Sequence, residues 1–240
     1  MARYCLKFGA NLHPRPGQSR EHGGVRLDTP APRSVQSEFR VLVLAAGPHG
    51  CAGIDMETGA IVRCQYPRPW NDLPEPYEVL RGRAGESEAE PPAYAPETVE
   101  LAELPELAGR LRGRKANRYL RPLVHPPGEH LLGDASASVP FWTVQGDRPS
   151  ITLVEPTSGP AVERDDDGLW CCFRTRRLTY RLPLHDRQLG AADHHPAAAR
   201  LEGTTLTRAL GWKPHRLLVA LTAPHDGRCY KVVAAVLPRP

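Results

Sequence analysis

The sequence lacks the features that would assign it to a membrane or to a familiar class of enzyme. No apolar run approaches the roughly 18 residues of a membrane-spanning helix, and residues 1–17 contain no apolar segment typical of a secretory signal. It has no G-x-S-x-G motif, no P-loop and no G-x-G-x-x-G motif. We therefore expect a cytoplasmic protein with no membrane partner, no cofactor and no small-molecule ligand. An enzyme with an unrecognised site stays open as an alternative.

Cysteine pairs at metal-binding spacing are also missing. The chain has six cysteines, but none of them form the C-x-x-C spacing of a zinc ribbon. A cytoplasmic compartment keeps thiols reduced. Cys64, Cys171 and Cys172 are therefore expected to be small core residues rather than members of disulfides, and no metal site is assigned.

Long helices are disfavoured by the composition. The 26 prolines and 21 glycines make up roughly a fifth of the 240 residues, and a proline inside a helix removes a hydrogen bond and clashes with the preceding turn. Short strands joined by many turns suit such a chain better. The expected fold class is mainly β, with short helices. The net charge of +4 is too small to indicate a polyanion ligand, so the distribution of charge must decide.

The character of the sequence changes along the chain. Residues 1–37 are rich in Pro, Gly, Arg and Ser, which predicts a disordered basic tail. Apolar strand patterns then predict two folded units, over 38–135 and 136–240. The first unit carries an acidic insert, and the second is expected to open with a strand at 141–145. A helix is expected over 98–112, where leucines recur at helical spacing: Leu101, Leu104, Leu107 and Leu111.

Two distant segments echo each other. Residues 39–64 and 216–237 each run through a buried strand to a Pro-His turn, after which a cysteine opens another strand. The simplest interpretation is two matching hairpins that pack together as a structural seam. An alternative is a zinc site, because Cys₂His₂ is a common ligand set. It requires the two turns to meet and to bring together four side chains: His49, Cys51, His225 and Cys229.

Clustered cations are the main functional signal. Residues 110–121 contain six basic residues and no acid, and residues 174–181 place four arginines near two aromatic residues. Cationic side chains bind phosphate, and aromatic rings stack on bases. The candidate nucleic-acid-binding residues are Arg112, Arg114, Lys115, Arg118, Arg174, Arg176 and Arg177, with Trp170 and Tyr180 as stacking platforms. A solvated helix face and a charge-protected edge strand are the structural alternatives.

Two stretches resemble the dual-OB domain family of prokaryotic proteins. The first, "VLVLAAGPHGCAGIDMETGAIVR", carries the match through Cys51, Ala52, Gly53, Gly59, Ile61 and Arg63, but lacks the family's tryptophan. The C-terminal match is carried by Tyr180, Leu182, Asp186, Leu221, Pro224, Gly227, Cys229, Tyr230, Lys231, Val233 and Ala234. The resemblance implies two small OB-like β-barrels packed together and a role in binding nucleic acid.

Three hypotheses for function result. The first is a non-catalytic module that binds single-stranded DNA or RNA through the clustered cations, because OB barrels bind oligonucleotides over one strand face and its loops. The second is a protein-interaction or scaffold module, in which the acidic segment 72–106 and apolar strand edges meet a protein partner. The third is an enzyme of unrecognised type. A fold alone does not decide among them.

Overall fold

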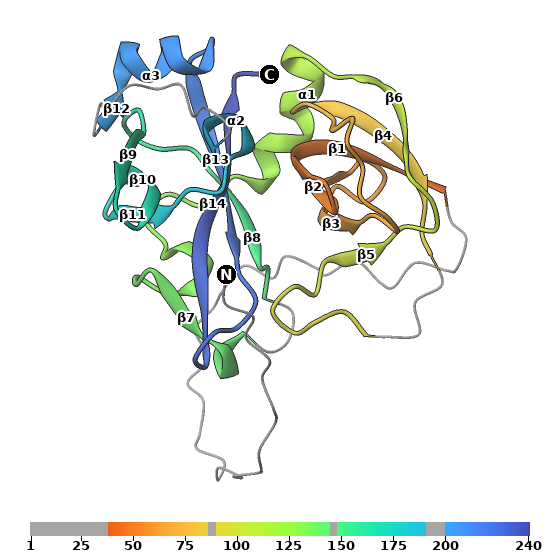
Figure 1. Ribbon diagram of the computed structural model, residues 1–240, viewed down its shortest axis with the longest axis horizontal. Coiled ribbons are helices and arrows are strands. Elements are labelled where there is room, and N and C mark those ends of the chain that lie inside the picture. Colours follow the sequence, from red (N-terminus) through yellow and green to blue (C-terminus); the bar gives the residue numbers. More distant parts are fainter. Residues whose placement is uncertain (1–37, 86–89, 145–147, 191–199) are drawn as a thin grey trace, which may run out of the picture.

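The protein consists of two β-rich halves that lie side by side (Figure 1). The computed structural model describes residues 38–85, 90–144, 148–190 and 200–240. The expected mainly β fold with short helices is confirmed. The tail expected over 1–37 lies outside the described residues. In the part of the chain that is described, no helix is both long and apolar enough to cross a membrane.

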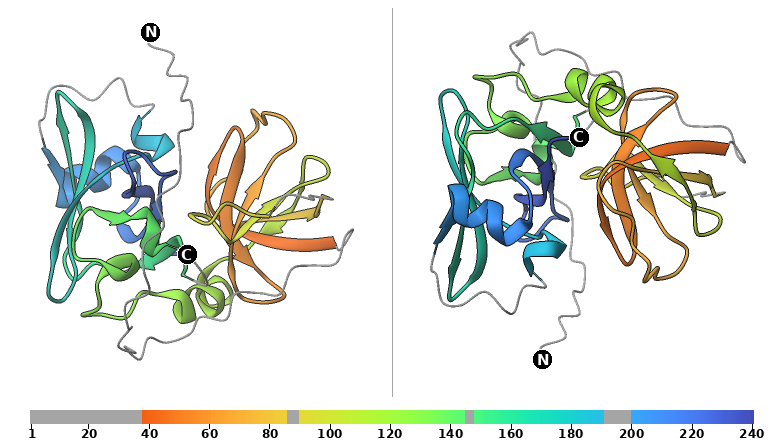
Figure 2. Two further views of the ribbon diagram at one scale, coloured as in Figure 1. Left: turned by 90° about the horizontal axis from the view of Figure 1, so that it is seen from below. Right: turned by 90° about the horizontal axis from the view of Figure 1, so that it is seen from above.

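The described residues of the first half form six strands. These are β1 (Glu38–Gly47), β2 (Gly50–Asp55), β3 (Ile61–Gln65), β4 (Glu78–Arg83), β5 (Thr98–Glu100) and β6 (Glu106–Arg110). Their order in the sheet is β5-β3-β2-β1-β4-β6, with only β3 and β5 parallel. The sheet curls into a half-barrel (Figure 2). At its closing edge Ala84 bridges to Leu101, and the Gly85 amide donates to the Glu100 carbonyl at 2.8 Å.

Strand β1 is buried on both faces, which explains its unbroken apolar pattern. Val41 and Val43 belong to the cluster inside the half-barrel. Leu42 and Leu44 alternate with them and belong to a second cluster, which is shared with the other half of the protein. A strand without a solvent-facing side has no polar alternation, so a short continuous apolar run marks it in the sequence.

The helix expected over 98–112 is wrong, because most of this segment forms β5 and β6. Leu101 is 5% exposed in the half-barrel core, whereas Leu107 is 58% exposed on β6. The leucines therefore do not share a face. Pro105 has no amide to donate within a helix, and β6 satisfies its backbone by pairing with β4 instead.

The described residues of the second half form eight strands in two sheets. These are β7 (Ser138–Pro140), β8 (Ile151–Val154), β9 (Ala161–Asp165), β10 (Gly168–Arg174), β11 (Thr179–Pro183), β12 (Arg200–Glu202), β13 (Pro214–Leu221) and β14 (Arg228–Pro238). The sheet orders are β7-β14-β13-β8 and β11-β10-β9-β12. The two sheets join where Leu184 bridges in parallel to Val233, whose carbonyl accepts the His185 amide at 2.9 Å.

One order of strand neighbours recurs in both halves. In the first half the chain of pairings runs β1-β2-β3-β5-β4 and returns to β1. In the second half it runs β9-β10-β11-β14-β13 and returns to β8, which directly precedes β9. Strands β8 and β9 together thus take the place of β1. Strand β1 pairs with β4 through its first residues and with β2 through its last, as β8 pairs with β13 and β9 pairs with β10.

Short helices cover the joints between the sheets. They are α1 (Gly113–Leu120), α2 (Arg187–Gly190) and α3 (Gly203–Leu210), with 3-10 turns at Arg121–Leu123, Leu131–Gly133 and Phe141–Thr143. Helix α1 inserts Ala116 and Leu120 between the halves. Helix α3 packs Leu206 into the core of the second half and ends at Gly211, which has the left-handed φ of 77° that glycine tolerates best.

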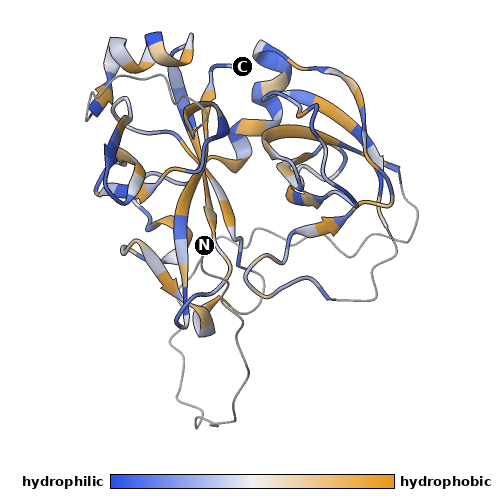
Figure 3. Ribbon diagram, in the orientation of Figure 1, coloured by the Kyte–Doolittle hydropathy of each residue, from blue (hydrophilic) through white to orange (hydrophobic). Residues whose placement is uncertain are grey.

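The two halves meet at a continuous apolar seam. Strands β1 and β2 face β8, β13 and β14 across it, and the corresponding apolar residues are orange in Figure 3. The two echoed hairpins therefore do pack on each other. Hydrogen bonds also cross the seam. The Tyr77 hydroxyl donates to the Pro238 carbonyl at 2.6 Å, and the Arg63 guanidinium donates to the Ser150 hydroxyl at 3.2 Å.

Candidate nucleic-acid interface

Helix α1 presents cations on one side and anchors itself with the other. Ala116 and Leu120 are fully buried in the seam. At 3.6 residues per turn, the opposite side of the helix is formed by Arg114, Arg118 and Arg121, which are spaced four and three residues apart and are exposed. Arg112 and Lys115 are exposed beside this stripe. None of these five cations forms an ion pair with a described residue.

Two side chains of α1 orient the stripe further. The Arg118 guanidinium lies 5.2 Å from the centre of the Tyr119 ring and donates to the Tyr119 hydroxyl at 3.2 Å. On the inner side, the Asn117 amide oxygen accepts a hydrogen bond from Arg216 at 3.1 Å. The helix is thus fixed to the start of β13, and its outer side stays open to solvent.

Arg216 and the C-terminus lie near this helix, and no local pattern in the sequence predicts it. The C-terminus ends beside α1 in Figure 1. The pKa of His215 is lowered, first by burial and then by the charges of Arg216, Arg239 and Lys213, with Glu155 acting in the opposite direction. Arg216 itself is buried and pairs with Glu155 at 3.4 Å. Lys213, Arg216 and Arg239 therefore lie close enough to His215 to act on it, and Glu155 offsets part of their charge.

The second predicted cation group lies elsewhere. Arg174, Arg176 and Arg177 are exposed where β10 turns into β11, and the turn is closed by the Thr175 amide donating to the Leu178 carbonyl at 2.9 Å. Strands β10 and β11 lie on the side of the second half that faces away from α1 (Figures 1 and 2). The structure therefore does not bring the two predicted groups into one surface.

Tyr180 is not a stacking platform, which corrects the sequence prediction. It is 3% exposed and stacks on Phe173 with ring centres 5.4 Å apart. Its hydroxyl accepts the Leu131 amide at 3.3 Å, and burial raises its pKa. Alternation along a strand predicts two faces but does not say which one is buried, and Tyr180 lies on the buried face of β11.

Trp170 is half-buried and already has a cation partner. The Arg181 guanidinium lies 4.2 Å from the centre of its ring, and its indole N–H donates to Asp165 at 2.8 Å. A base would have to displace Arg181 to stack on that side of the ring. Among the described residues, the exposed aromatic side chains are Trp142, at 66%, and Tyr230, at 38%.

Trp142 lies in a segment for which the predicted strand at 141–145 is wrong. Phe141–Thr143 is a 3-10 turn, in which the Val144 amide donates to the Phe141 carbonyl at 3.0 Å and the Thr143 hydroxyl donates to the Pro140 carbonyl at 2.8 Å. Local hydrogen bonds thus replace strand pairing here. The apolar residues of this short segment could not distinguish the two outcomes.

The sheet of β9 to β12 carries cations that are neutralised in place. Arg181 pairs with Glu163 at 3.3 Å and with Asp165, and Arg200 pairs with Glu163 and with Glu202 at 2.9 Å. The pKa of Glu163 is lowered by a hydrogen bond from the Cys172 thiol and, next after the opposing effect of burial, by Arg181. Opposite charges alternate across this face, so it has little net attraction for a polyanion.

Lys231 is a cation enclosed in the core of the second half. Its side chain is fully buried, and its ammonium donates to the carbonyls of Asp134 at 2.5 Å and Ser136 at 2.7 Å. The ammonium lies 5.9 Å from the centre of the Tyr180 ring. Burial lowers the pKa of Lys231 to about 8. Its role is to hold the segment before β7 against β14, and it is not available to a surface ligand.

The zinc alternative is excluded by the positions of the two cysteines. Cys51 packs inside the half-barrel of the first half, whereas Cys229 packs in the core of the second. His49 and His225 are exposed. Within the described residues no group of three or more His, Cys, Asp or Glu side chains is placed to hold a metal ion. Cys64 and Cys171 are buried core thiols, as expected, while Cys172 is only half-buried.

Comparisons with family models, with curated proteins and with solved structures find no match to this chain.

Proposed function

We propose that the protein is a non-catalytic module that binds single-stranded nucleic acid, built from two OB-like barrels of the dual-OB type. The order of strand neighbours supports this architecture. An OB fold is a five-stranded Greek-key barrel, and each half contains five strands, or strand equivalents, in one recurring ring order with a single parallel pair. The first strand, or its equivalent β8 and β9, pairs with two neighbours in both halves.

The observation that carries the proposed function is the cationic side of α1. Arg114, Arg118 and Arg121 form an exposed stripe without acidic partners among the described residues. Beyond the inner side of α1, where Arg216 donates to Asn117, the charges of Lys213 and Arg239 act on His215. Exposed guanidinium groups bind phosphate oxygens directly, and they do so without first breaking an ion pair. A surface of this kind holds the backbone of a nucleic acid and does not read its sequence.

The expected binding is therefore salt-dependent and tolerant of sequence. Fluorescence anisotropy with labelled oligothymidylate, mixed-sequence single-stranded DNA, RNA and duplex DNA tests it. We expect the logarithm of the association constant to fall linearly with the logarithm of salt concentration, with a slope of about −0.7 per neutralised phosphate of a single strand. Polyglutamate serves as the control polyanion. Absence of binding to all four nucleic acids at low salt would refute the proposal.

A protein-interaction module is the second candidate, and the exposed aromatic residues favour it. Trp142 and Tyr230 come from neighbouring segments, because β7 pairs with β14 and the Phe141 amide donates to the Gly227 carbonyl at 2.9 Å. Large exposed aromatic residues are enriched where proteins bind one another. Trp142→Ser tests this candidate by sedimentation. A fall in self-association, with nucleic-acid binding unchanged, would support a protein interface between copies of this chain.

A further inference from the structure

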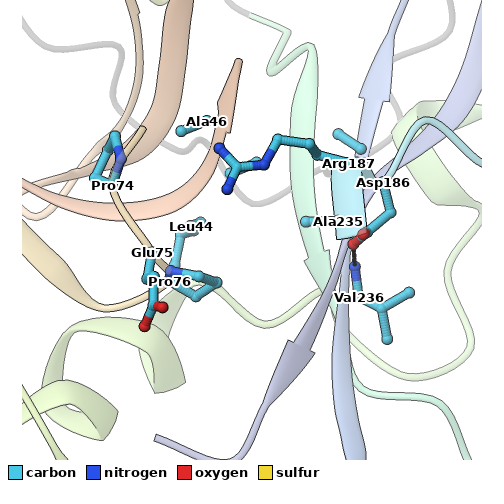
Figure 4. A pocket seen from close by; sticks show the side chains of 11 residues that line it. Leu44, Ala46, Pro74, Glu75, Pro76, Asp186, Arg187, Ala235 and Val236 are labelled. Carbon is cyan, nitrogen blue, oxygen red and sulfur yellow. Dashed lines mark hydrogen bonds between the residues drawn. The ribbon is translucent and has the colours of Figure 1, made fainter. Parts of the chain in front are cut away.

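A cleft of about 420 Å³ lies between the two halves. One wall is formed by β1, β2, β3 and the turn at His49, and the other by β13, β14 and His185. A smaller pocket of about 70 Å³ shares Ala45, Ala46 and Ala234 with the cleft and continues it along β1 and β14 (Figure 4). The two spaces therefore form one groove along the seam.

Small residues keep the groove open. Its lining includes Ala45, Ala46, Gly47, Gly50, Ala52, Ala220 and Ala234. Gly50 has a further local reason, since a Cβ there would lie 2.2 Å from the Cys64 carbonyl oxygen. The alanine methyl groups on the facing strands line a slot with an apolar surface. A slot of this volume lies within the range of small-molecule sites and exceeds what a phosphate alone would fill.

The charges of the groove favour an anion. The lining of the larger cleft contains Arg63, His49 and His185 and no carboxylate, but Arg63 already pairs with Glu97 at 3.5 Å. In the smaller pocket, the Arg187 guanidinium extends from α2 toward Ala46 (Figure 4). Arg187 forms no ion pair with a described residue.

The two carboxylates of the smaller pocket are already engaged. Asp186 accepts the Val236 amide at 2.7 Å and the Leu189 amide at 3.2 Å, and Glu75 pairs with Arg110 at 2.8 Å. Because they have these partners, the two carboxylates repel a bound anion less than carboxylates without partners would. The Glu75–Arg110 pair also places this end of the groove close to the residues that precede α1.

Polar atoms near the larger cleft have unused hydrogen-bonding capacity. Arg63 lines the cleft and donates one N–H to Ser150, while the same terminal nitrogen lies 3.5 Å from Glu97. Its Nε is buried and has no hydrogen-bond partner, and the same holds for the second carboxylate oxygen of Glu97, a side chain that is only 9% exposed. Buried polar groups normally have a partner, because an unpaired one loses its hydrogen bonds to water without replacement. A ligand at this end of the cleft therefore meets an unpaired acceptor on Glu97 as well as an unpaired donor on Arg63, and a phosphate there would be repelled by Glu97.

We infer that the groove binds one nucleotide unit, with the base against the alanine-lined walls and the phosphate near Arg187 and the two histidines. The inference rests on the proposed function and names a second contact surface beyond α1. The nucleotide is either free or part of a single strand that continues onto the cationic side of α1. A duplex does not expose an unpaired base and is not accepted by the slot.

Filling the groove tests the inference. Ala234→Phe places a ring between the walls, and Ala108→Phe adds the same ring at an exposed position of β6, outside the groove. We expect Ala234→Phe to weaken binding of oligothymidylate about tenfold or more, equivalent to about 1.4 kcal/mol, and Ala108→Phe to leave it unchanged. The double variant His49→Ala/His185→Ala removes two exposed side chains and weakens binding without filling space, which guards against a folding defect in the first variant.

Photo-crosslinking locates the base directly. An oligonucleotide that contains 4-thiothymidine is irradiated with the wild-type protein, and the crosslinked peptides are identified by mass spectrometry. Crosslinks to residues 45–52 or 220–234 support the inference. Competition by a free mononucleotide distinguishes its source: displacement of the oligonucleotide indicates that the unit binds alone, and failure to displace indicates that the strand is required.

The possible failures are distinguishable. If the wild-type protein binds oligothymidylate but Ala234→Phe binds equally well, and all crosslinks map to 112–121, the groove inference is overturned while the proposed function stands. If the wild-type protein binds no nucleic acid, the proposed function fails as well.

Discussion

Helix α1 and the sheet of β9 to β12 both carry exposed cations, but they differ in whether the fold pairs those cations with acids. On the sheet, Arg181 and Arg200 share Glu163, and each has a further acidic partner. On α1 the stripe of Arg114, Arg118 and Arg121 has no such partner among the described residues. The comparison shows that counting cations in a sequence measures charge and not the capacity to bind phosphate. What decides is whether the fold brings acids to the same face.

The largest effect is expected from releasing α1 from the seam. Leu120 is fully buried there, and Leu120→Ala leaves a cavity between the halves. We expect the free energy of unfolding to fall by about 2–5 kcal/mol, as for other buried leucines, and nucleic-acid binding to weaken with it. Urea unfolding measures the change. Leu107→Ala, at an exposed leucine, is the matched control, and an equal loss for both variants would contradict this packing of α1.

Neutralising the stripe should produce the largest change in binding at constant stability. Arg114→Gln, Arg118→Gln and Arg121→Gln together remove three phosphate contacts. We expect affinity for oligothymidylate to fall about ten- to a hundredfold and the salt slope to become shallower by about 2. The matched triple variant is Arg174→Gln, Arg176→Gln and Arg177→Gln, which removes the same charge from the second half. Equal losses from the two triple variants would contradict the assignment of the interface to α1.

Sequence patterns identified the features that depend on residues close together in the chain. The buried runs of 41–44 and 216–221 were recognisable because a strand covered on both sides has no polar alternation. The cations of α1 were also recognisable, because they are clustered within a short segment of the chain. The echo between the two hairpins was visible too, and it marks the seam and not a metal site.

The remainder depends on pairings between distant residues. Tyr180 and Trp170 were assigned to binding because they lie near the clustered arginines, but whether a strand face is buried depends on what packs over it. The approach of the C-terminal cations to α1 depends on the contact between Asn117 and Arg216, which are 99 positions apart. The groove has two walls that come from different halves of the protein. Ala46 and Ala234 are far apart in the sequence, and nothing in the local pattern around either residue predicts that they line the same groove.

Lys231 is a third kind of cation, neither exposed as on α1 nor paired with acids as on the sheet of β9 to β12, because it is buried in the protein. Its pKa is lowered from 10.5 to about 8 in the folded protein. Between these values the unfolded chain binds a proton that the folded chain has lost, so the contribution of Lys231 to stability rises with pH across this window. We expect the difference in free energy of unfolding, wild type minus Lys231→Met, to increase from about pH 8 toward pH 10.5. A difference that stays constant over this range would contradict burial of the ammonium.

The smallest effect is expected from Arg181 on the neutralised sheet. Arg181→Gln removes the ion pairs with Glu163 and Asp165 and uncovers the ring of Trp170. Exposed ion pairs contribute about 0–1 kcal/mol, so stability should change little. Binding of nucleic acid should also stay within about twofold of wild type, because Asp165 then loses its cation, while Glu163 keeps Arg200, and the added negative charge offsets any gain from the uncovered ring. Anisotropy and quenching of Trp170 fluorescence by oligothymidylate measure both outcomes. Strong quenching together with tighter binding would show that this sheet, and not α1 alone, contacts the bases.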